Sequence, residues 1–100
     1  MNNISIKDFL KINKKDLQII DVREDYEHEN GSLDAINIPM NQILASQQRI
    51  SRKKKVIIYC QSGRRAAAVI YMLKRKFDLK NIFNLVGGYN AYIKYTTNKS

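Results

Sequence analysis

The sequence predicts an α/β fold organised around a parallel sheet. Apolar runs bounded by polar or turn-forming residues alternate with segments of helical period along the 100 residues, as expected for strands joined by crossover helices. The run VIIY at residues 56–59 is apolar without alternation, which is typical of a strand buried on both faces. A chain of this length forms one domain, residues 1–100, around one core.

The first part of the chain predicts one helix and two strands. In residues 5–12, SIKDFLKI, Ser5 can cap a helix whose apolar residues fall on one face. Residues 16–22, DLQIIDV, predict a buried strand. Residues 35–39, AINIP, predict a short strand, and Pro39 ends it because proline has no N–H for a central ladder position.

The middle of the chain predicts a helix and the main strand. Residues 40–48, MNQILASQQ, are expected to be helical, with Met40, Ile43 and Leu44 facing the core. Residues 55–60, KVIIYC, predict the most strongly indicated strand, at a central position in the sheet.

The last part of the chain predicts a long helix, a strand and a short helix. The long helix begins directly after Arg65, because the apolar residues that follow recur at helical spacing: Ala66, Val69, Ile70, Leu73 and Phe77. Residues 81–86, NIFNLV, predict the last strand, and residues 87–95, GGYNAYIKY, predict the last helix.

The charge is strongly positive, at +9, and its densest run is RISRKKK at residues 49–55. We predict that this run is a solvated loop and that nucleic acid is not a partner, because zinc-finger spacing and aromatic RNA-binding signatures are absent from the sequence. An acidic carrier protein would be attracted to such a surface.

The cysteine and histidine content limits the possible chemistry. With one cysteine and one histidine, an internal disulfide is impossible and a metal site is not expected, and nothing indicates a cofactor. Apolar runs are too short for a membrane span, and Lys7, Asp8 and Lys11 interrupt any signal-like segment. We therefore expect a cytoplasmic location, without membrane attachment.

The only cysteine, Cys60, lies between the predicted central strand and the long helix, in the segment YCQSGRR. Loops at the carboxyl ends of parallel strands are where ligands usually bind, and unpaired N–H groups at the start of a helix favour negative charge. Gly63 allows the tight turn that this requires, and Arg65 adds positive charge nearby. These features predict a thiolate that is exposed at the top of the sheet.

Four segments together resemble the single-domain rhodanese, or thiosulfate sulfurtransferase-like, family. CQSGRR has the form Cys-x-x-Gly-x-Arg of that family's active-site loop, and the other segments are IIDVRE, AINIP and NLVGGYNAY. They occur in the family's order between residues 17 and 92. The resemblance implies a rhodanese-like fold, with a central, mostly parallel sheet of about five strands and helices on both faces. Ser32 and Tyr92 replace a histidine and a tryptophan of the family pattern, which affects local packing more than chemistry.

The resemblance also implies sulfur transfer. Cys60 would be the catalytic nucleophile that takes a sulfane sulfur from thiosulfate or a persulfide and passes it to a thiol, a thioredoxin-like protein or cyanide. The substrate-binding residues would be those that follow it in the loop: Gln61, Ser62, Gly63, Arg64 and Arg65.

Asp21 and Arg23, in the DVR segment, are interpreted as supporting residues beside the loop. Asp21 is expected to accept hydrogen bonds, and Arg23 is expected to pair with a carboxylate such as Glu27.

Two other functions remain open at this point. A rhodanese-like module could bind or regulate without turnover, although such modules often lack the loop cysteine. A cysteine phosphatase or arsenate reductase would use the same nucleophile, but phosphatases of this type have five residues between cysteine and arginine. Here four residues separate Cys60 from Arg65. The resemblance to the rhodanese family implies that this tighter loop suits a single sulfur atom.

Overall fold

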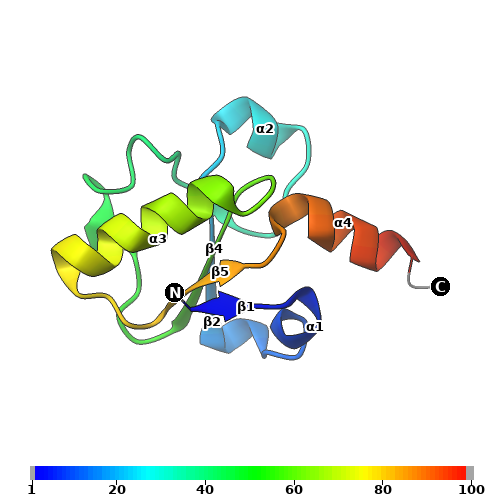
Figure 1. The fold of residues 1–100 in the computed structure, drawn as a ribbon, viewed down its shortest axis with the longest axis horizontal. Helices are drawn as coiled ribbons and strands as arrows, with labels where there is room; N and C mark the ends of the chain where they lie inside the picture. Colours follow the sequence, from blue (N-terminus) through cyan, green and yellow to red (C-terminus); the bar gives the residue numbers. More distant parts are fainter. Residues whose placement is uncertain (1, 99–100) are drawn as a thin grey trace.

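The computed structural model describes residues 2–98, which form a five-stranded parallel sheet in the order β1-β5-β4-β2-β3 with helices around it (Figure 1). The elements in chain order are β1 (Asn3–Ile4), α1 (Ile6–Phe9), the 3₁₀ turn η1 (Lys14–Asp16), β2 (Leu17–Asp21), α2 (Asp25–Glu29), β3 (Ile36–Asn37), the 3₁₀ turn η2 (Gln47–Arg49), β4 (Lys55–Tyr59), α3 (Arg64–Phe77), β5 (Ile82–Leu85) and α4 (Gly88–Asn98). The predicted α/β fold with a parallel sheet is confirmed.

Strand β4 occupies the centre of the sheet because its side chains are apolar on both faces. It pairs with β2 on one side and with β5 on the other. The residues Ile57 and Ile58 point to opposite faces and are both 0% exposed. The predicted central strand is therefore confirmed, and Cys60 follows directly after its last residue.

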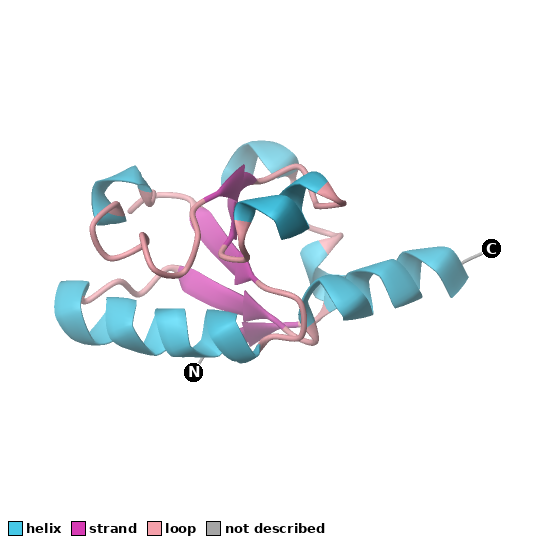
Figure 2. Cartoon of the chain, turned by 90° about the horizontal axis from the view of Figure 1, so that it is seen from above, coloured by secondary structure: helices cyan, strands magenta, loops and turns pink. Residues whose placement is uncertain are grey.

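The core has two parts, one on each face of the sheet. The first contains Ile20, Ile58 and the inward side of α3, which contributes Val69 and Leu73. The second lies under α1 and α4 and is centred on Ile57. Figure 2 shows the strands enclosed by helical segments, as a parallel sheet with two buried faces requires. Among residues 2–98, no helix has both the length and the hydropathy needed to cross a bilayer.

Most of the predicted elements are present. Helix α1 is shorter than predicted but is capped as expected, because the Ser5 Oγ accepts a hydrogen bond from the Asp8 N–H at 3.1 Å. The strands predicted at residues 16–22, 35–39 and 81–86 correspond to β2, β3 and β5. Helix α3 begins at Arg64, two residues before the prediction, and α4 continues to Asn98.

The helix predicted for residues 40–48 is wrong. This segment is a series of turns ending in η2, and Met40 is exposed rather than inward, whereas Ile43 is buried. The Gln42 N–H bonds to the Pro39 carbonyl three residues earlier, so the chain turns more tightly than an α-helix. Ile43 is buried in the α3-side core, and the chain reaches that position through turns.

One strand and one α-helix were not predicted. Strand β1 has only two residues and pairs with β5, so it leaves no periodic signal. Helix α2 has no buried residue and therefore lacks an apolar face. Its signal is the capping box formed by Glu24 and Glu27. In it, the backbone N–H of Glu24 donates to Oε1 of Glu27 at 3.0 Å.

Candidate active site

The loop of residues 60–65, called here the cysteine loop, connects the end of β4 to the start of α3. It turns back sharply at Gly63, which has φ 101° and ψ −12°. Glycine is the residue that adopts positive φ without steric cost, so the turn predicted at this position is present. The turn directs the first N–H groups of α3 toward the strand end.

The Cys60 sulfur accepts hydrogen bonds from two backbone N–H groups. The Gly63 nitrogen lies 3.1 Å from Sγ, and the Ala66 nitrogen lies 3.4 Å from it. Ala66 lies one residue beyond the predicted set of donors. N–H groups at the start of a helix point out of its first turn, and here two of them are directed at the sulfur.

The prediction that the sulfur is exposed is wrong. Cys60 is 1% exposed and belongs to the α3-side core, together with Val22, Ile43 and Val69. The backbone of the loop must pass close to Sγ for two of its N–H groups to bond to the sulfur, and that backbone then covers the sulfur.

A groove of about 410 Å³ opens beside the cysteine loop, between α3 and the turns that follow β3. Its wall includes Arg65, Met40 and Met72, and its floor includes Ile43 and Val69. These two floor residues also belong to the cluster around Cys60.

Helix α4 holds the cysteine loop from behind. The Tyr89 N–H donates to the Cys60 carbonyl at 2.9 Å, and the Asn90 N–H donates to the Gln61 carbonyl at 3.0 Å. This contact requires glycine at position 88, because an added Cβ would lie 2.8 Å from the Gln61 carbonyl oxygen and closer still to that of Cys60. The N–H groups of Tyr89 and Asn90 lie in the first turn of α4, where amides have no helical partner, and the loop carbonyls accept their hydrogen bonds instead.

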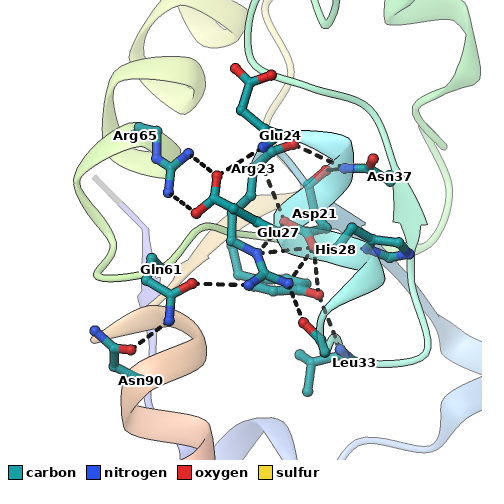
Figure 3. Close-up of polar contacts among 12 residues, drawn as sticks. Asp21, Arg23, Glu24, Glu27, His28, Leu33, Asn37, Gln61, Arg65 and Asn90 are labelled. Carbon is teal, nitrogen blue, oxygen red and sulfur yellow. Dashed lines mark hydrogen bonds and ion pairs between the residues drawn. The ribbon is translucent and has the colours of Figure 1, made fainter.

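Asp21, at the end of β2, is the centre of a buried polar network (Figure 3). Arg23 donates to both carboxylate oxygens through its backbone N–H, Nε and Nη2, at 2.8–3.1 Å. The Tyr59 hydroxyl donates to Oδ2 at 3.0 Å, and Nδ1 of His28 lies 2.8 Å from the same oxygen. Asp21 therefore accepts hydrogen bonds from residues on three separate segments.

Arg23 connects this network to the cysteine loop. Its side chain is 2% exposed, and its Nη1 donates to Oε1 of Gln61 at 2.9 Å while Nη2 donates to the Gly31 carbonyl at 2.7 Å. The guanidinium carbon lies 5.5 Å from the Tyr59 ring centroid and 4.6 Å from that of Tyr89, within cation–π range. Arg23 pairs with a carboxylate as predicted, but the carboxylate is that of Asp21 and not that of Glu27, the example given from the sequence.

The ionisation of this network follows from its contacts. Burial alone would raise the pKa of the Asp21 carboxyl, but the hydrogen bonds from Arg23 and His28 outweigh burial and lower it. Burial opposes the charged form of Arg23 as well, and Asp21 reverses that effect, so the pKa of Arg23 is raised. Burial also raises the pKa of Tyr59 well above its usual range. Asp21 and Arg23 are therefore an ion pair, with a neutral tyrosine as donor.

Glu27 on α2 pairs instead with Arg65. The two guanidinium nitrogens lie 2.7 and 2.9 Å from the two carboxylate oxygens, a bidentate geometry that fixes the first turn of α3 to α2 (Figure 3). Arg65, one of the residues predicted to bind substrate, has a side chain that is 35% exposed and contacts Glu27. Hydrogen bonds from Arg65 lower the pKa of Glu27, and the same contact raises the pKa of Arg65.

The Glu27→Gln variant is expected to lose about 1 kcal/mol of unfolding free energy near neutral pH, because the pair is partly exposed but bidentate. The folded-state pKa of Glu27 is below its ordinary value of 4.5, so this contribution is present above pH 4.5 and disappears as pH falls through the folded-state pKa. Urea unfolding of both proteins across this range measures the difference. Glu29→Gln, an exposed position on α2, is the control, and an equal loss there would refute the pairing argument.

The remaining predicted residues lie on the outside of the loop. Ser62 and Arg64 are exposed, and Gln61 is half-buried between Arg23 and Asn90. Tyr59 and His28 were not predicted as part of the site. Side chains alternate between the two faces of a strand, so Tyr59 and its neighbour Cys60 point to opposite sides of the sheet, with Tyr59 on the α4 side. This alternation is the signal in the sequence that could have placed Tyr59. His28 left no signal, because only folding brings it to Asp21.

Known proteins resemble this chain in sequence and in structure. A family model described as Rhodanese-like domain matches residues 6–95. A sulfurtransferase from Allochromatium vinosum is 30% identical over 83 residues, an alignment that covers 81% of this chain and 76% of that protein. A thiosulfate sulfurtransferase from Coxiella burnetii is 24% identical over 82 residues, with coverages of 81% and 76%.

Among solved structures, a rhodanese-related protein from Thermoplasma volcanium has a TM-score of 0.85 and 30% sequence identity, covering 95% of this chain and 93% of that one. The family match extends over both faces of the sheet and includes the cysteine loop. The sheet of five parallel strands and its flanking helices agree with this structural neighbour. The chain therefore belongs to the rhodanese-like domain family.

Proposed function

We propose that the protein is a sulfurtransferase that carries sulfane sulfur as a persulfide on Cys60. The single observation that carries the proposal is the pair of N–H groups from Gly63 and Ala66 at 3.1 and 3.4 Å from Sγ. Such donors stabilise a thiolate before the reaction and an anionic persulfide after it. The similarity to proteins named sulfurtransferase and thiosulfate sulfurtransferase supports the same chemistry.

The reaction has two displacement steps. The Cys60 thiolate attacks the outer sulfur of thiosulfate, forming an S–S bond while the bond to the sulfonate sulfur breaks and sulfite leaves with its electron pair. An acceptor thiolate or cyanide then attacks the terminal sulfur, and the Cys60 thiolate leaves. Neither step requires a general base when the thiolate is already formed. The chain has no second cysteine, so the acceptor must come from outside it.

The surrounding residues are assigned supporting roles. Arg64, exposed on the outer side of the loop, would attract the dianionic donor, and Ser62 would donate to it from the same side. Arg65 would fix the start of α3 through Glu27, so that the amides stay directed at the sulfur. Asp21 and Arg23 would hold Gln61 and, through it, the inner part of the loop.

The experiment is mass spectrometry of the intact protein after incubation with thiosulfate. We expect a gain of one sulfur atom, its localisation to the Cys60 peptide by fragmentation, and its removal by cyanide with release of thiocyanate. The Cys60→Ser variant should gain nothing. A wild-type protein that stays unmodified with thiosulfate and with a low-molecular-weight persulfide would contradict the proposal.

A non-catalytic binding module is the second candidate, and the 1% exposure of Cys60 is the observation that favours it. The rate of alkylation by iodoacetamide discriminates between the two functions. If the protein is a sulfurtransferase, Cys60 in the folded protein should react with iodoacetamide at neutral pH at least as fast as Cys60 in the denatured protein. A thiolate that is already formed in the folded state is the reason. A folded protein whose thiol reacts only after denaturation is the result expected for the module.

A further inference from the structure

Two cationic segments far apart in the sequence meet at the end of the sheet opposite Cys60. Arg52 Nη1 donates to the Phe77 carbonyl at 3.5 Å. Asn81 Nδ2 donates to the carbonyls of Ser51 and Lys54 at 2.8 and 2.7 Å. Figure 1 shows the C-terminal turn of α3 and the segment that leads into β4 at the same end of the molecule. This is where β4 begins, whereas the cysteine loop follows its last residue.

The surface formed there is called the basic end. Its residues are Arg52, Lys53, Lys54, Lys74, Arg75, Lys76 and Lys80. Six of them are exposed, and Lys74 is half-buried. Asp78 is the only carboxylate within residues 52–54 and 74–80, and it lies 4.0 Å from the Lys80 Nζ in a fully solvated contact. The basic end therefore keeps a large uncompensated positive charge.

The acidic residues gather elsewhere. Of the nine carboxylates in the chain, six lie within residues 21–34, which include α2 and the end of β2 beside the cysteine loop. Arg23 and Arg65 at that end are both paired with carboxylates. The net charge of +9 is thus concentrated away from the candidate active site. A polyanion would be attracted to the basic end and leave the cysteine loop free.

The composition of the basic end favours nucleic acid over an acidic protein. Protein–protein interfaces have an apolar centre and few lysines, whereas nucleic-acid interfaces are polar and strongly positive. The large apolar side chain that is exposed beside these cations is Tyr71, 57% exposed, whose hydroxyl accepts a hydrogen bond from Arg75 Nη1 at 3.0 Å. Tyr71, Lys74 and Arg75 line one shallow hollow with Ile70. An exposed ring among cations suits an unpaired base flanked by phosphates.

We propose that the basic end binds single-stranded RNA, with its lysines and arginines on the phosphates and Tyr71 stacked on a base. The proposal reverses the sequence-based prediction that nucleic acid is not a partner, which considered the run at residues 49–55 as a solvated loop. The structure adds the last turn of α3, Lys80 and an aromatic ring to that loop. This function is separate from sulfur transfer and does not depend on it.

The test is fluorescence anisotropy with a labelled oligouridine of about 20 nucleotides, titrated between about 50 and 200 mM salt. Each phosphate contact contributes about −0.7 to the slope of log affinity against log salt. The triple variant Lys53→Gln/Lys76→Gln/Lys80→Gln should bind at least about tenfold more weakly and show a slope less negative by about 2.

The matched control removes the same charge from the α1 and α4 side of the molecule. Lys7→Gln/Lys11→Gln/Lys94→Gln changes three exposed lysines and should weaken binding by less than about threefold, through net charge alone. Equal losses in the two triple variants would overturn the proposal, because the binding would then depend on net charge and not on this surface. Absence of measurable binding by the wild type at the lowest salt would overturn it as well.

Stacking is tested separately. Tyr71→Ala should weaken oligouridine binding by about fivefold or more, whereas Tyr26→Ala, 62% exposed on α2, should leave it unchanged. Binding of duplex DNA or polyglutamate as tightly as the oligouridine, without sensitivity to Tyr71, would also overturn the proposal; the polyglutamate result would favour an acidic protein. All these variants should still acquire sulfur on Cys60 if the wild type does, so the outcome is independent of the proposed enzymatic function.

Discussion

Replacing Asp21 with asparagine is expected to lower the free energy of unfolding by about 3–5 kcal/mol. Arg23 is 2% exposed, and asparagine would leave its charge buried without a counter-ion. The substitution also replaces an acceptor with an amide NH₂ that faces the donors Tyr59 and His28. Because burial and charge pairing act together here, this loss should be among the largest from any single polar substitution in the chain.

Urea unfolding at neutral pH measures this loss. The matched control is Asp34→Asn, which removes an exposed carboxylate and should change stability by less than about 0.5 kcal/mol. We also expect slower sulfur loading in Asp21→Asn, because Arg23 then loses the anchor from which it holds Gln61. If Asp21→Asn unfolded within about 1 kcal/mol of the wild type, the network would not be the buried ion pair described here.

The Gly88→Ala variant is expected to lose about 3 kcal/mol or more and to fail in sulfur loading. Gly88 has φ +60°, and an added Cβ would lie 2.8 Å from the Gln61 carbonyl carbon and oxygen. These are backbone atoms that cannot rotate away. The cysteine loop or α4 must therefore shift, and a shift releases the hydrogen bonds from the Tyr89 and Asn90 amides.

The Gly63→Ala variant is a comparison that introduces backbone strain without a steric clash. Gly63 also has positive φ, +101°, but its nearest neighbour would be the Gly87 nitrogen at 3.6 Å, an ordinary contact distance. Conformational strain alone should cost about 1–3 kcal/mol at either position, so Gly88→Ala should exceed Gly63→Ala by about 2 kcal/mol. Equal costs, measured by urea unfolding, would mean that the contact between α4 and the loop carbonyls can relax freely.

Local signals in the sequence were sufficient where one element carries its own pattern. Strand β4 and helix α3 are found within two residues of their predicted positions, because an unbroken apolar run and a strict helical period each leave few alternatives. The turn at Gly63 and the amides directed at Cys60 follow from this junction. This part of the site depends on a single contiguous segment.

Features that depend on contacts between distant segments were not predictable. The burial of Cys60 depends on Ile43, in a segment whose turns were mistaken for a helix. The choice between Asp21 and Glu27 as partner of Arg23 depends on where α2 lies, and α2 has no apolar face that would reveal it. Hydrophobic periodicity reports what a residue buries, and it carries no information about which of two carboxylates an arginine reaches.

The pairing of the first strand with the last has a consequence for biosynthesis. Asn3 and Ile4 are synthesised well before their partners Asn84 and Leu85. The α4 amides that bind the Cys60 and Gln61 carbonyls emerge later still. A nascent chain can therefore contain β2, β4 and α3 before the α4 amides are present, so the backbone that carries the thiol is fixed in place only after α4 has been synthesised.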